Sequence, residues 1–143
     1  MGWTIRLAQL SDWPDWRALD ARLSRALFER KCAAGECYVA EANGAVAGLL
    51  RWNRFWDEAP FCTLLMVDEG HRGQGLGRAL MERWEADMVA TGHGMVMTST
   101  QVDETAQHFY RKLGYRDAGG FAVDIPGYAQ PLELILIKKV EPT

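Results

Sequence analysis

Hydrophobic residues recur at every fourth position in the middle of the chain, directly after a glycine-rich stretch. This spacing is shared by Leu76, Leu80, Trp84 and Met88. It places the four side chains on one face of an amphipathic helix, which we expect to run from about Gly75 to Thr91. Apolar runs at Phe61–Val67 and at 94–99 predict a strand before and after that helix. A strand, a helix and a strand in this order form a βαβ unit, so the two strands are predicted to be parallel.

The beginning of the chain predicts a strand followed by helical cover. Trp3–Leu7 is typical of a strand, and a helix is expected after it, with Ser11 as its N-cap and Pro14 in its first turn. Leucines at every fourth position up to Gly35 indicate one bent helix or two: Leu19, Leu23 and Leu27.

A hairpin is predicted next. Asn43 and Gly44 suit a type I′ turn between strands at Glu36–Ala42 and Ala45–Phe55. Aromatic side chains are dense around the loop at 57–60: Trp52, Phe55, Trp56 and Phe61. Packing in the core and the wall of an acceptor pocket are both open interpretations of this cluster.

The last third of the chain predicts a short helix and two strands. The helix is expected from Asp103 to Leu113, ended by Gly114. Its inner face would carry Ala106, Phe109 and Leu113. Strands are predicted at Phe121–Asp124 and Leu132–Lys138, with a turn at Pro126-Gly127 between them. The pattern as a whole predicts an α/β fold with a mixed sheet.

The glycine-rich stretch has the character of a phosphate-binding loop. Glycines alternate with other residues in Arg72-Gly73-Gln74-Gly75-Leu76-Gly77-Arg78. Because the stretch lies between a strand and a helix start, its backbone amides and the helix dipole favour an anion. The spacing is not that of a dinucleotide fingerprint, and the lysine and hydroxyl of a P-loop are lacking. A glycine-rich turn without a ligand is the remaining alternative.

Composition narrows the class of protein. The chain has 143 residues, which fits one domain spanning 1–143. Its formal net charge of −3 argues against a nucleic-acid partner. Three cysteines without C-x-x-C spacing indicate buried free thiols and no thiolate metal site: Cys32, Cys37 and Cys62. With neither a signal peptide nor a long apolar run, we expect a cytoplasmic protein without a membrane partner.

Two motifs resemble those of the GCN5-related N-acetyltransferases, the GNAT family. The first is the R-x-x-G-x-G pattern at 72–77, which is similar to the acetyl-CoA pyrophosphate loop of that family. The second is the stretch at 106–115, A-Q-H-F-Y-R-K-L-G-Y, which is similar to the family's A-x-x-F-Y-x-K-x-G-F/Y signature. The resemblance implies a GNAT-like fold and an acyltransferase that uses acetyl-CoA as co-substrate and needs no metal.

The resemblance also implies roles for particular residues. The backbone of Leu65, Met66 and Val67 would bind the pantetheine arm and the thioester oxygen, and the loop at 72–78 would bind the pyrophosphate. The Tyr110 hydroxyl would act as the general acid for the departing thiolate. Where the family often has asparagine, this chain has Asp103, which we expect to cap the helix; a cofactor contact from Asp103 is left open.

The acceptor and the general base are less defined by the motifs. Candidate bases are the carboxylates of Asp57, Glu58 and Asp124, with His71 and His108 as weaker candidates. Asp57 and Glu58 lie beside Trp56, so charge pairing and cation–π contact would favour a small basic amine as the acceptor.

Two alternatives stay open at this point. One is an acyl-CoA-binding sensor or interaction module without turnover, and another is an acceptor amine on a peptide or protein. The oligomeric state, including a homodimer, is also open.

Overall fold

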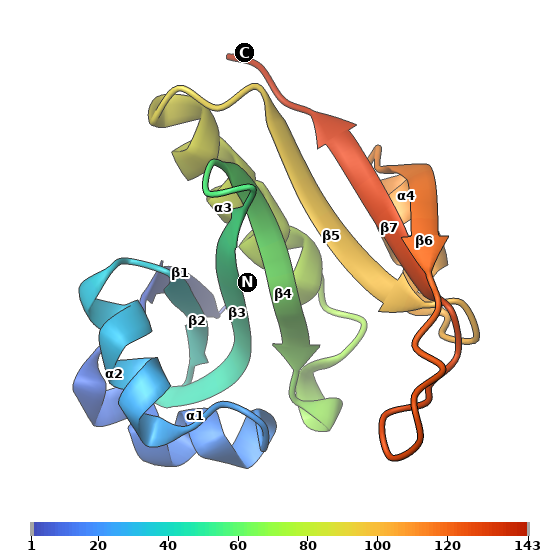
Figure 1. Ribbon diagram of the computed structural model, residues 1–143. Helices are drawn as coiled ribbons and strands as arrows, with labels where there is room; N and C mark the ends of the chain where they lie inside the picture. Colours follow the sequence, from blue (N-terminus) through green and yellow to red (C-terminus); the bar gives the residue numbers. More distant parts are fainter. Residues whose placement is uncertain (1, 143) are drawn as a thin grey trace. The chain divides into compact units, whose positions relative to one another are not determined.

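The computed structural model describes residues 2–142, which form two compact units (Figure 1). The first unit comprises the residues up to Asn53 together with Thr63–Asp87, and the second comprises Arg54–Cys62 together with the residues from Met88 onward. Within the described range there are seven strands and four α-helices, with both parallel and antiparallel strand pairs. The predicted mixed α/β class is therefore confirmed, while the single domain at 1–143 stays a prediction.

The strands of the first unit follow the predicted hairpin. β1 (Trp3–Leu7) pairs antiparallel with β2 (Cys37–Ala42), and β2 pairs antiparallel with β3 (Ala45–Phe55). Asn43 and Gly44 both have positive φ, 54° and 78°. This backbone matches a type I′ turn, which explains why the Asn-Gly pair located the hairpin correctly.

Two helices precede the hairpin, α1 (Trp13–Leu19) and α2 (Arg25–Ala33). Pro14 lies in the first turn of α1 as predicted, but the N-cap is Asp12; the expectation for Ser11 is wrong. Ser11 lies instead within the short 3₁₀ turn η1 (Leu10–Asp12). The Asp12 carboxylate accepts a hydrogen bond from the Gln9 amide at 2.7 Å. This bond spans η1, so α1 begins one residue later than the sequence suggested.

Aromatic residues form the centre of the core beneath these helices, together with Leu23 and with Leu19 packed against them. Trp16 and Phe28 are fully buried with their ring centroids 5.1 Å apart. Leu23 is buried in the connection between the helices, whereas Leu27 is 37% exposed. The chain leaves the helix at Asp20, so the four-residue periodicity does not continue on one face. The two-helix alternative is confirmed.

α3 (Leu76–Ala90) carries the predicted stripe. Leu76, Leu80, Trp84 and Met88 are all buried. Figure 1 shows α3 and the pair α1–α2 on opposite sides of β2 and β3. Trp84 packs 6.3 Å from Trp52 of β3, so Trp52 belongs to the core and not to an acceptor pocket.

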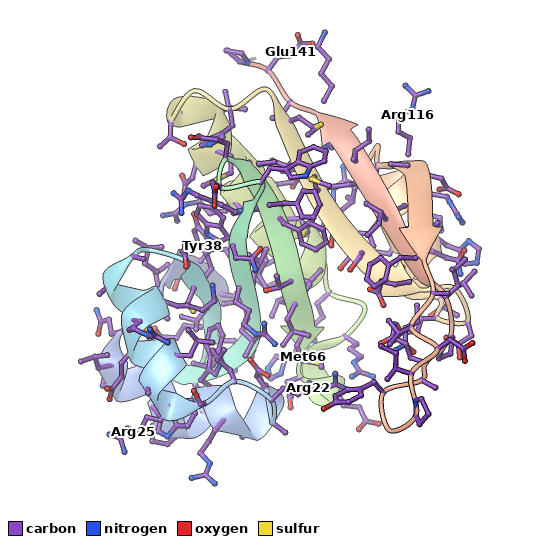
Figure 2. The ribbon with its side chains drawn as sticks, in the orientation of Figure 1. Arg22, Arg25, Tyr38, Met66, Arg116 and Glu141 are labelled. Atoms are coloured by element: carbon purple, nitrogen blue, oxygen red, sulfur yellow. The ribbon has the colours of Figure 1, made fainter. Side chains whose placement is uncertain are left out.

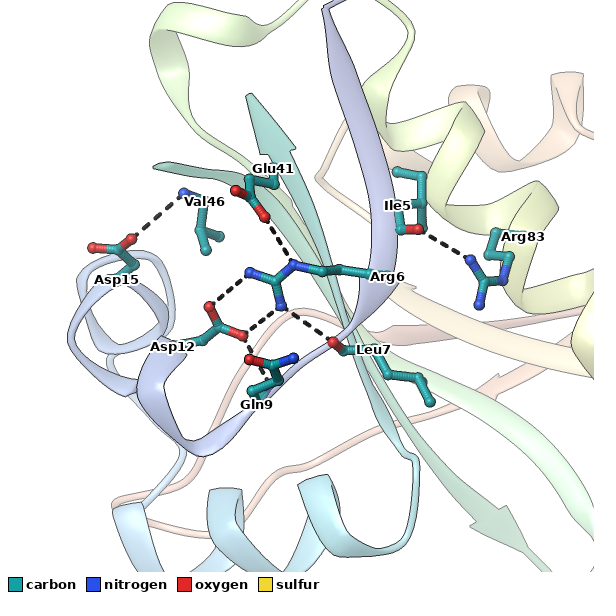
Figure 3. Close-up of polar contacts among 9 residues, drawn as sticks. All are labelled: Ile5, Arg6, Leu7, Gln9, Asp12, Asp15, Glu41, Val46 and Arg83. Carbon is teal, nitrogen blue, oxygen red and sulfur yellow. Dashed lines mark hydrogen bonds and ion pairs between the residues drawn. The ribbon is translucent and has the colours of Figure 1, made fainter. Parts of the chain in front are cut away.

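A charged network attaches β1 to its neighbours (Figure 3). The Arg6 guanidinium donates to both carboxylate oxygens of Asp12 at 2.8 and 2.9 Å, and its Nε donates to Glu41 at 2.8 Å. Arg83 of α3 donates to the Ile5 carbonyl at 3.0 Å. The hydrogen bonds from Arg6 lower the pKa of Asp12.

The second unit contains the other strand of the βαβ unit. The first part of β4 (Ala59–Val67) pairs parallel with β5 (Met95–Gln101), with Phe61 opposite Met97 and Cys62 opposite Thr98. The parallel pairing was predicted. β5 pairs antiparallel with β7 (Glu133–Lys139), which was predicted at nearly these bounds.

The strand expected at Phe121–Asp124 is displaced toward the N-terminus. The observed strand, β6 (Arg116–Phe121), pairs antiparallel with β7, and Asp124 lies outside it. Gly120 approaches β7 so closely that a Cβ there would lie 2.5 Å from the Glu133 carbonyl oxygen. A glycine-rich segment has low strand propensity, so pairing with β7 decides its conformation.

α4 (Ala106–Lys112) begins later than predicted. Its N-cap is Thr105, so the expectation that Asp103 caps this helix is wrong. Gly114 ends the helix region with φ of 99°, as predicted. Tyr110 is the buried residue of α4, while Ala106, Phe109 and Leu113 are half-buried.

The state of the cysteines and the length of the helices can also be compared with the predictions. Cys37 and Cys62 are buried, Cys32 is half-buried, and all three are free thiols as predicted. Burial raises the pKa of the Cys37 thiol to about 12, which keeps it protonated. No helix between residues 2 and 142 has both the length and the apolar composition needed to cross a membrane.

Candidate active site

The glycine-rich loop of the first unit connects β4 to α3. After β4 the chain forms a short 3₁₀ turn, η2 (Glu69–His71), and then the exposed stretch that leads to Leu76. Gly73 and Gly75 have left-handed φ values of 79° and 87°, and the space at each missing Cβ is open. The loop therefore exposes backbone that a side chain would cover, which fits the approach of a phosphate group.

The start of α3 adds unpaired amides to this loop. The first helical hydrogen bond runs from the Ala79 amide to the Gly75 carbonyl at 3.0 Å. The amides of Leu76, Gly77 and Arg78 precede it and have no carbonyl one turn earlier within the helix. The Leu76 side chain is buried while its backbone begins the helix, so the hydrophobic core holds these donors in place. Gln74 is exposed in the loop.

Charged side chains around the loop have partners within the first unit. Arg72 donates through Nε to the Val67 carbonyl at 3.2 Å, and Arg78 pairs with Glu82 at 3.3 Å. His71 lies 3.0 Å from Asp68. Arg72 and Arg78 are exposed, so both guanidinium groups remain accessible to an anion.

The end of β4 leads directly into the loop. Leu65, Met66 and Val67 are half-buried, and the Met66 side chain packs against the core beneath α1 and α2. Figure 2 shows Met66 at this end of β4. The Asp68 amide is bound to the Ala47 carbonyl at 2.8 Å, which holds the exit of the strand against β3.

Tyr110 of the second unit lies in a buried polar cluster. Its side chain interacts with that of Thr98, and the Thr98 hydroxyl donates a hydrogen bond to the Cys62 carbonyl at 3.0 Å. Burial is the main cause that raises the Tyr110 pKa, and the nearby Cys62 adds to it. The phenol is consequently protonated at neutral pH and can act only as a proton or hydrogen-bond donor. Sequence reasoning missed Thr98, although a threonine inside a buried strand is a signal for a polar contact.

The candidate bases occupy exposed positions in the second unit. Asp57 and Glu58 lie in the turn between β3 and β4, where Trp56 and Asp57 have φ values of 56° and 65°. Trp56 is 76% exposed and stacks near Phe55 at 4.6 Å. The base candidates His108 and Asp124 are exposed as well, and so is Asp103, for which a cofactor contact is left open.

Each unit thus contains its own set of candidate functional groups. The first provides an anion-accepting loop at a helix start, and the second provides a buried tyrosine that is protonated. Between residues 2 and 142, no group of three histidine, cysteine, aspartate or glutamate side chains is placed to hold a metal ion.

Comparison with solved structures supports the fold. Ard1 from Thermoplasma volcanium superposes with a TM-score of 0.86 at 19% identity, covering 99% of this chain and 100% of that one. The ribosomal-protein-S18-alanine N-acetyltransferase from Escherichia coli has a TM-score of 0.79 at 20% identity, covering 99% and 96%. A GNAT acetyltransferase from Elizabethkingia anophelis with acetyl-CoA bound has a TM-score of 0.76 at 18% identity, covering 97% and 99%.

The family follows from a match to a model of related sequences. The model described as an acetyltransferase (GNAT) domain matches residues 33–117, which is more than half of the chain and includes both motifs. This match shows that the chain belongs to the GNAT family, and the protein is therefore an acetyl-CoA-dependent N-acetyltransferase.

Proposed function

We propose that the protein transfers the acetyl group of acetyl-CoA to the primary amine of a small molecule by direct attack on the thioester. The observation that carries the cofactor part of this proposal is the loop at 72–78. Its two left-handed glycines have open space at their Cβ positions and precede the unpaired amides of a fifteen-residue helix. Such an arrangement suits the pyrophosphate of the co-substrate.

In the proposed reaction, the amine nitrogen attacks the thioester carbonyl carbon and the C–S bond breaks. Backbone amides of Leu65–Val67 would polarise the carbonyl oxygen. Tyr110 would give a hydrogen bond or a proton to the departing thiolate, whose ordinary pKa is about 8.5. Because burial raises the Tyr110 pKa, the phenol supplies stabilisation without losing its own proton beforehand.

A carboxylate is proposed to receive the proton of the amine. An alkylamine with pKa about 10.4 is protonated at pH 7, and deprotonation there costs about 4.6 kcal/mol. Asp57 and Glu58 are the proposed acceptor-side carboxylates, acting directly or through water. Their exposed position beside Trp56 supports a contact with a positively charged amine.

One alternative acceptor has a specific observation in its favour. The name of the Escherichia coli relative states that it acetylates an alanine of a ribosomal protein, which makes a protein N-terminus the second candidate acceptor. We further propose a cytoplasmic protein without nucleic-acid or membrane partners; the net charge of −3 supports the absence of a nucleic-acid partner.

The test is a thiol-release assay with acetyl-CoA against polyamines, aminoglycosides, amino acids and peptides with free N-termini. The proposal requires acetylation of at least one small amine with a higher kcat/KM than any peptide. Thiol release with peptides and with none of the small amines would contradict the proposed acceptor.

A further inference from the structure

A cavity of about 470 Å³ opens in the first unit beside α2. It extends from α2 across β3 to Thr63 of β4, and Leu23 and Leu27 form an apolar wall. Its polar lining consists of Arg30, Lys31, Glu36, Arg51, Asn53 and Thr63. A volume of this size is typical of sites for small molecules.

The carboxylate nearest to Arg51 is already saturated with donors. Asp20 is fully buried and accepts the Arg51 Nε at 2.8 Å and the Trp16 indole N–H at 3.1 Å on one oxygen. Its other oxygen accepts the backbone amides of Arg22 and Leu23 at 3.1 and 3.4 Å. Asp20 therefore fixes the Arg51 guanidinium in the wall and offers no oxygen to a ligand.

A second ion pair lies in the same wall. The Lys31 ammonium donates to Glu36 at 3.0 Å and also to the Trp52 carbonyl. Both side chains are largely buried, with 9% and 16% exposure. Lys31 and Glu36 thus neutralise each other.

The remaining charge in the cavity is positive. Between residues 2 and 142 the Arg30 side chain forms no ion pair or hydrogen bond, and it is exposed at the cavity. The charge balance is three cationic side chains, those of Arg30, Lys31 and Arg51, against the two carboxylates of Glu36 and Asp20. One positive charge is therefore in excess. Asn53 adds a neutral amide with donor capacity. A guanidinium without a partner matches a carboxylate, which it can bind through two parallel hydrogen bonds.

We propose that this cavity receives the carboxylate of the acceptor, and that Arg30 determines this preference. The inference rests on the proposed function and names its substrate class: a small amine that also carries a carboxylate, such as an amino acid. Thr63 of β4 lines the cavity, and β4 continues from it to Leu65, whose backbone is proposed to bind the thioester. A protein N-terminus lacks a free carboxylate next to its amine and would not match Arg30.

The experiment compares amines that differ only in the carboxylate. Thiol release is measured for amino acids, for their carboxamides and for the decarboxylated amines. We expect kcat/KM to be at least tenfold higher for the amino acid than for its carboxamide. The Arg30→Gln variant should lose most of this preference, while its kcat/KM for the carboxamide stays the same. Asn53→Asp, which puts a negative charge into the cavity, should act in the same direction.

Arg25→Gln is the matched control. Arg25 lies on the outer side of α2, is paired with Glu29 at 3.3 Å and does not line the cavity (Figure 2). This variant loses the same charge from the same helix, so it should keep the preference for the acid.

A binding measurement separates this inference from the proposed reaction. N-acetylated amino acids and their amides are titrated into the CoA-bound protein by calorimetry. If the N-acetylated amino acid binds more tightly than its amide and this difference depends on Arg30, the cavity is a carboxylate site. This result would stand even if no amine is acetylated, in which case only the proposed reaction fails. Equal binding or turnover of acid and amide, or a higher kcat/KM for a peptide N-terminus than for amino acids, overturns the inference.

Discussion

The Tyr110 side chain of α4 interacts with that of Thr98 of β5 inside the second unit, and the Thr98 hydroxyl donates a hydrogen bond to the Cys62 carbonyl at 3.0 Å. Thr98 is almost fully buried. Removing this hydroxyl therefore leaves polar atoms unpaired in a low-dielectric environment, where an unsatisfied group costs about 1–3 kcal/mol.

Thr98→Val tests this relationship. The variant keeps the shape of the side chain but not the hydrogen bond, so we expect a loss of about 1–3 kcal/mol in unfolding free energy by denaturant titration. A variant with unchanged stability would show that this contact is unimportant.

Tyr110→Phe tests the proposed general acid. We expect kcat to fall by about 10²-fold or more while the acetyl-CoA KM is kept, because the thiolate charge develops only during the reaction. Tyr115→Phe is the matched control, since Tyr115 is buried 5.8 Å from the Tyr110 ring and has no proposed role in the reaction. If kcat stays within about twofold with chemistry rate-limiting, Tyr110 has a packing role.

Gly77 is a better position than Gly75 for testing the phosphate loop. Gly75 has φ of 87°, so any side chain there strains the backbone. A loss of acetyl-CoA binding in a Gly75 variant could therefore come from a folding defect. Gly77 is the second residue of α3, where the helical backbone accepts a side chain without the strain of a positive φ. Gly77→Leu should therefore weaken acetyl-CoA binding at least tenfold in calorimetry while the Tm is kept.

Ala86→Leu provides the comparison for that variant, because it adds the same side chain at an exposed position of α3. It should leave acetyl-CoA binding unchanged. Equal affinity of the Gly77→Leu protein and the parent would contradict the assignment of the pyrophosphate to this loop.

The Arg6–Asp12 pair should make stability depend on acid pH. The hydrogen bonds from Arg6 lower the Asp12 pKa in the folded state. The pair therefore stabilises the fold at pH values above the carboxyl pKa of the unfolded chain, which is about 3.9. The contribution is lost as pH falls through the lower folded pKa. Since Arg6 is partly exposed and the pair is screened, Asp12→Asn should cost about 1 kcal/mol at pH 7.

The measurement is the free energy of unfolding of both proteins from pH 7 down to about pH 2. The difference between the two should shrink as the pH is lowered. A difference that stays constant over this range would show that the carboxylate charge is not its origin.

The carboxylates of the β3–β4 turn give a prediction for the acceptor amine. An Asp57→Asn/Glu58→Gln double variant should raise the acceptor KM several-fold at low salt, because partly exposed charge contacts contribute about 0.5–1 kcal/mol each. The acetyl-CoA KM should not change. Asp15→Asn/Glu141→Gln removes the same number of exposed charges and should leave the acceptor KM as it is.

Local patterns account for what the sequence alone determined. The stripe from Leu76 to Met88, the Asn43-Gly44 hairpin and the glycines before α3 were predictable because each depends on neighbouring residues. The spacing of those glycines and the second motif at 106–115 were sufficient by themselves to indicate the family, because both are runs of adjacent residues.

Contacts between distant residues decided the rest. The position of β6 depends on how closely Gly120 approaches Glu133 of β7, and the burial of Trp16 and Phe28 depends on the turn that Asp20 makes. The wall of the cavity beside α2 contains the ion pair of Lys31 with Glu36 and the Arg51 side chain that Asp20 binds. Only the tertiary structure reveals these pairs, because charge pairing and desolvation depend on distances between side chains that sequence spacing does not determine.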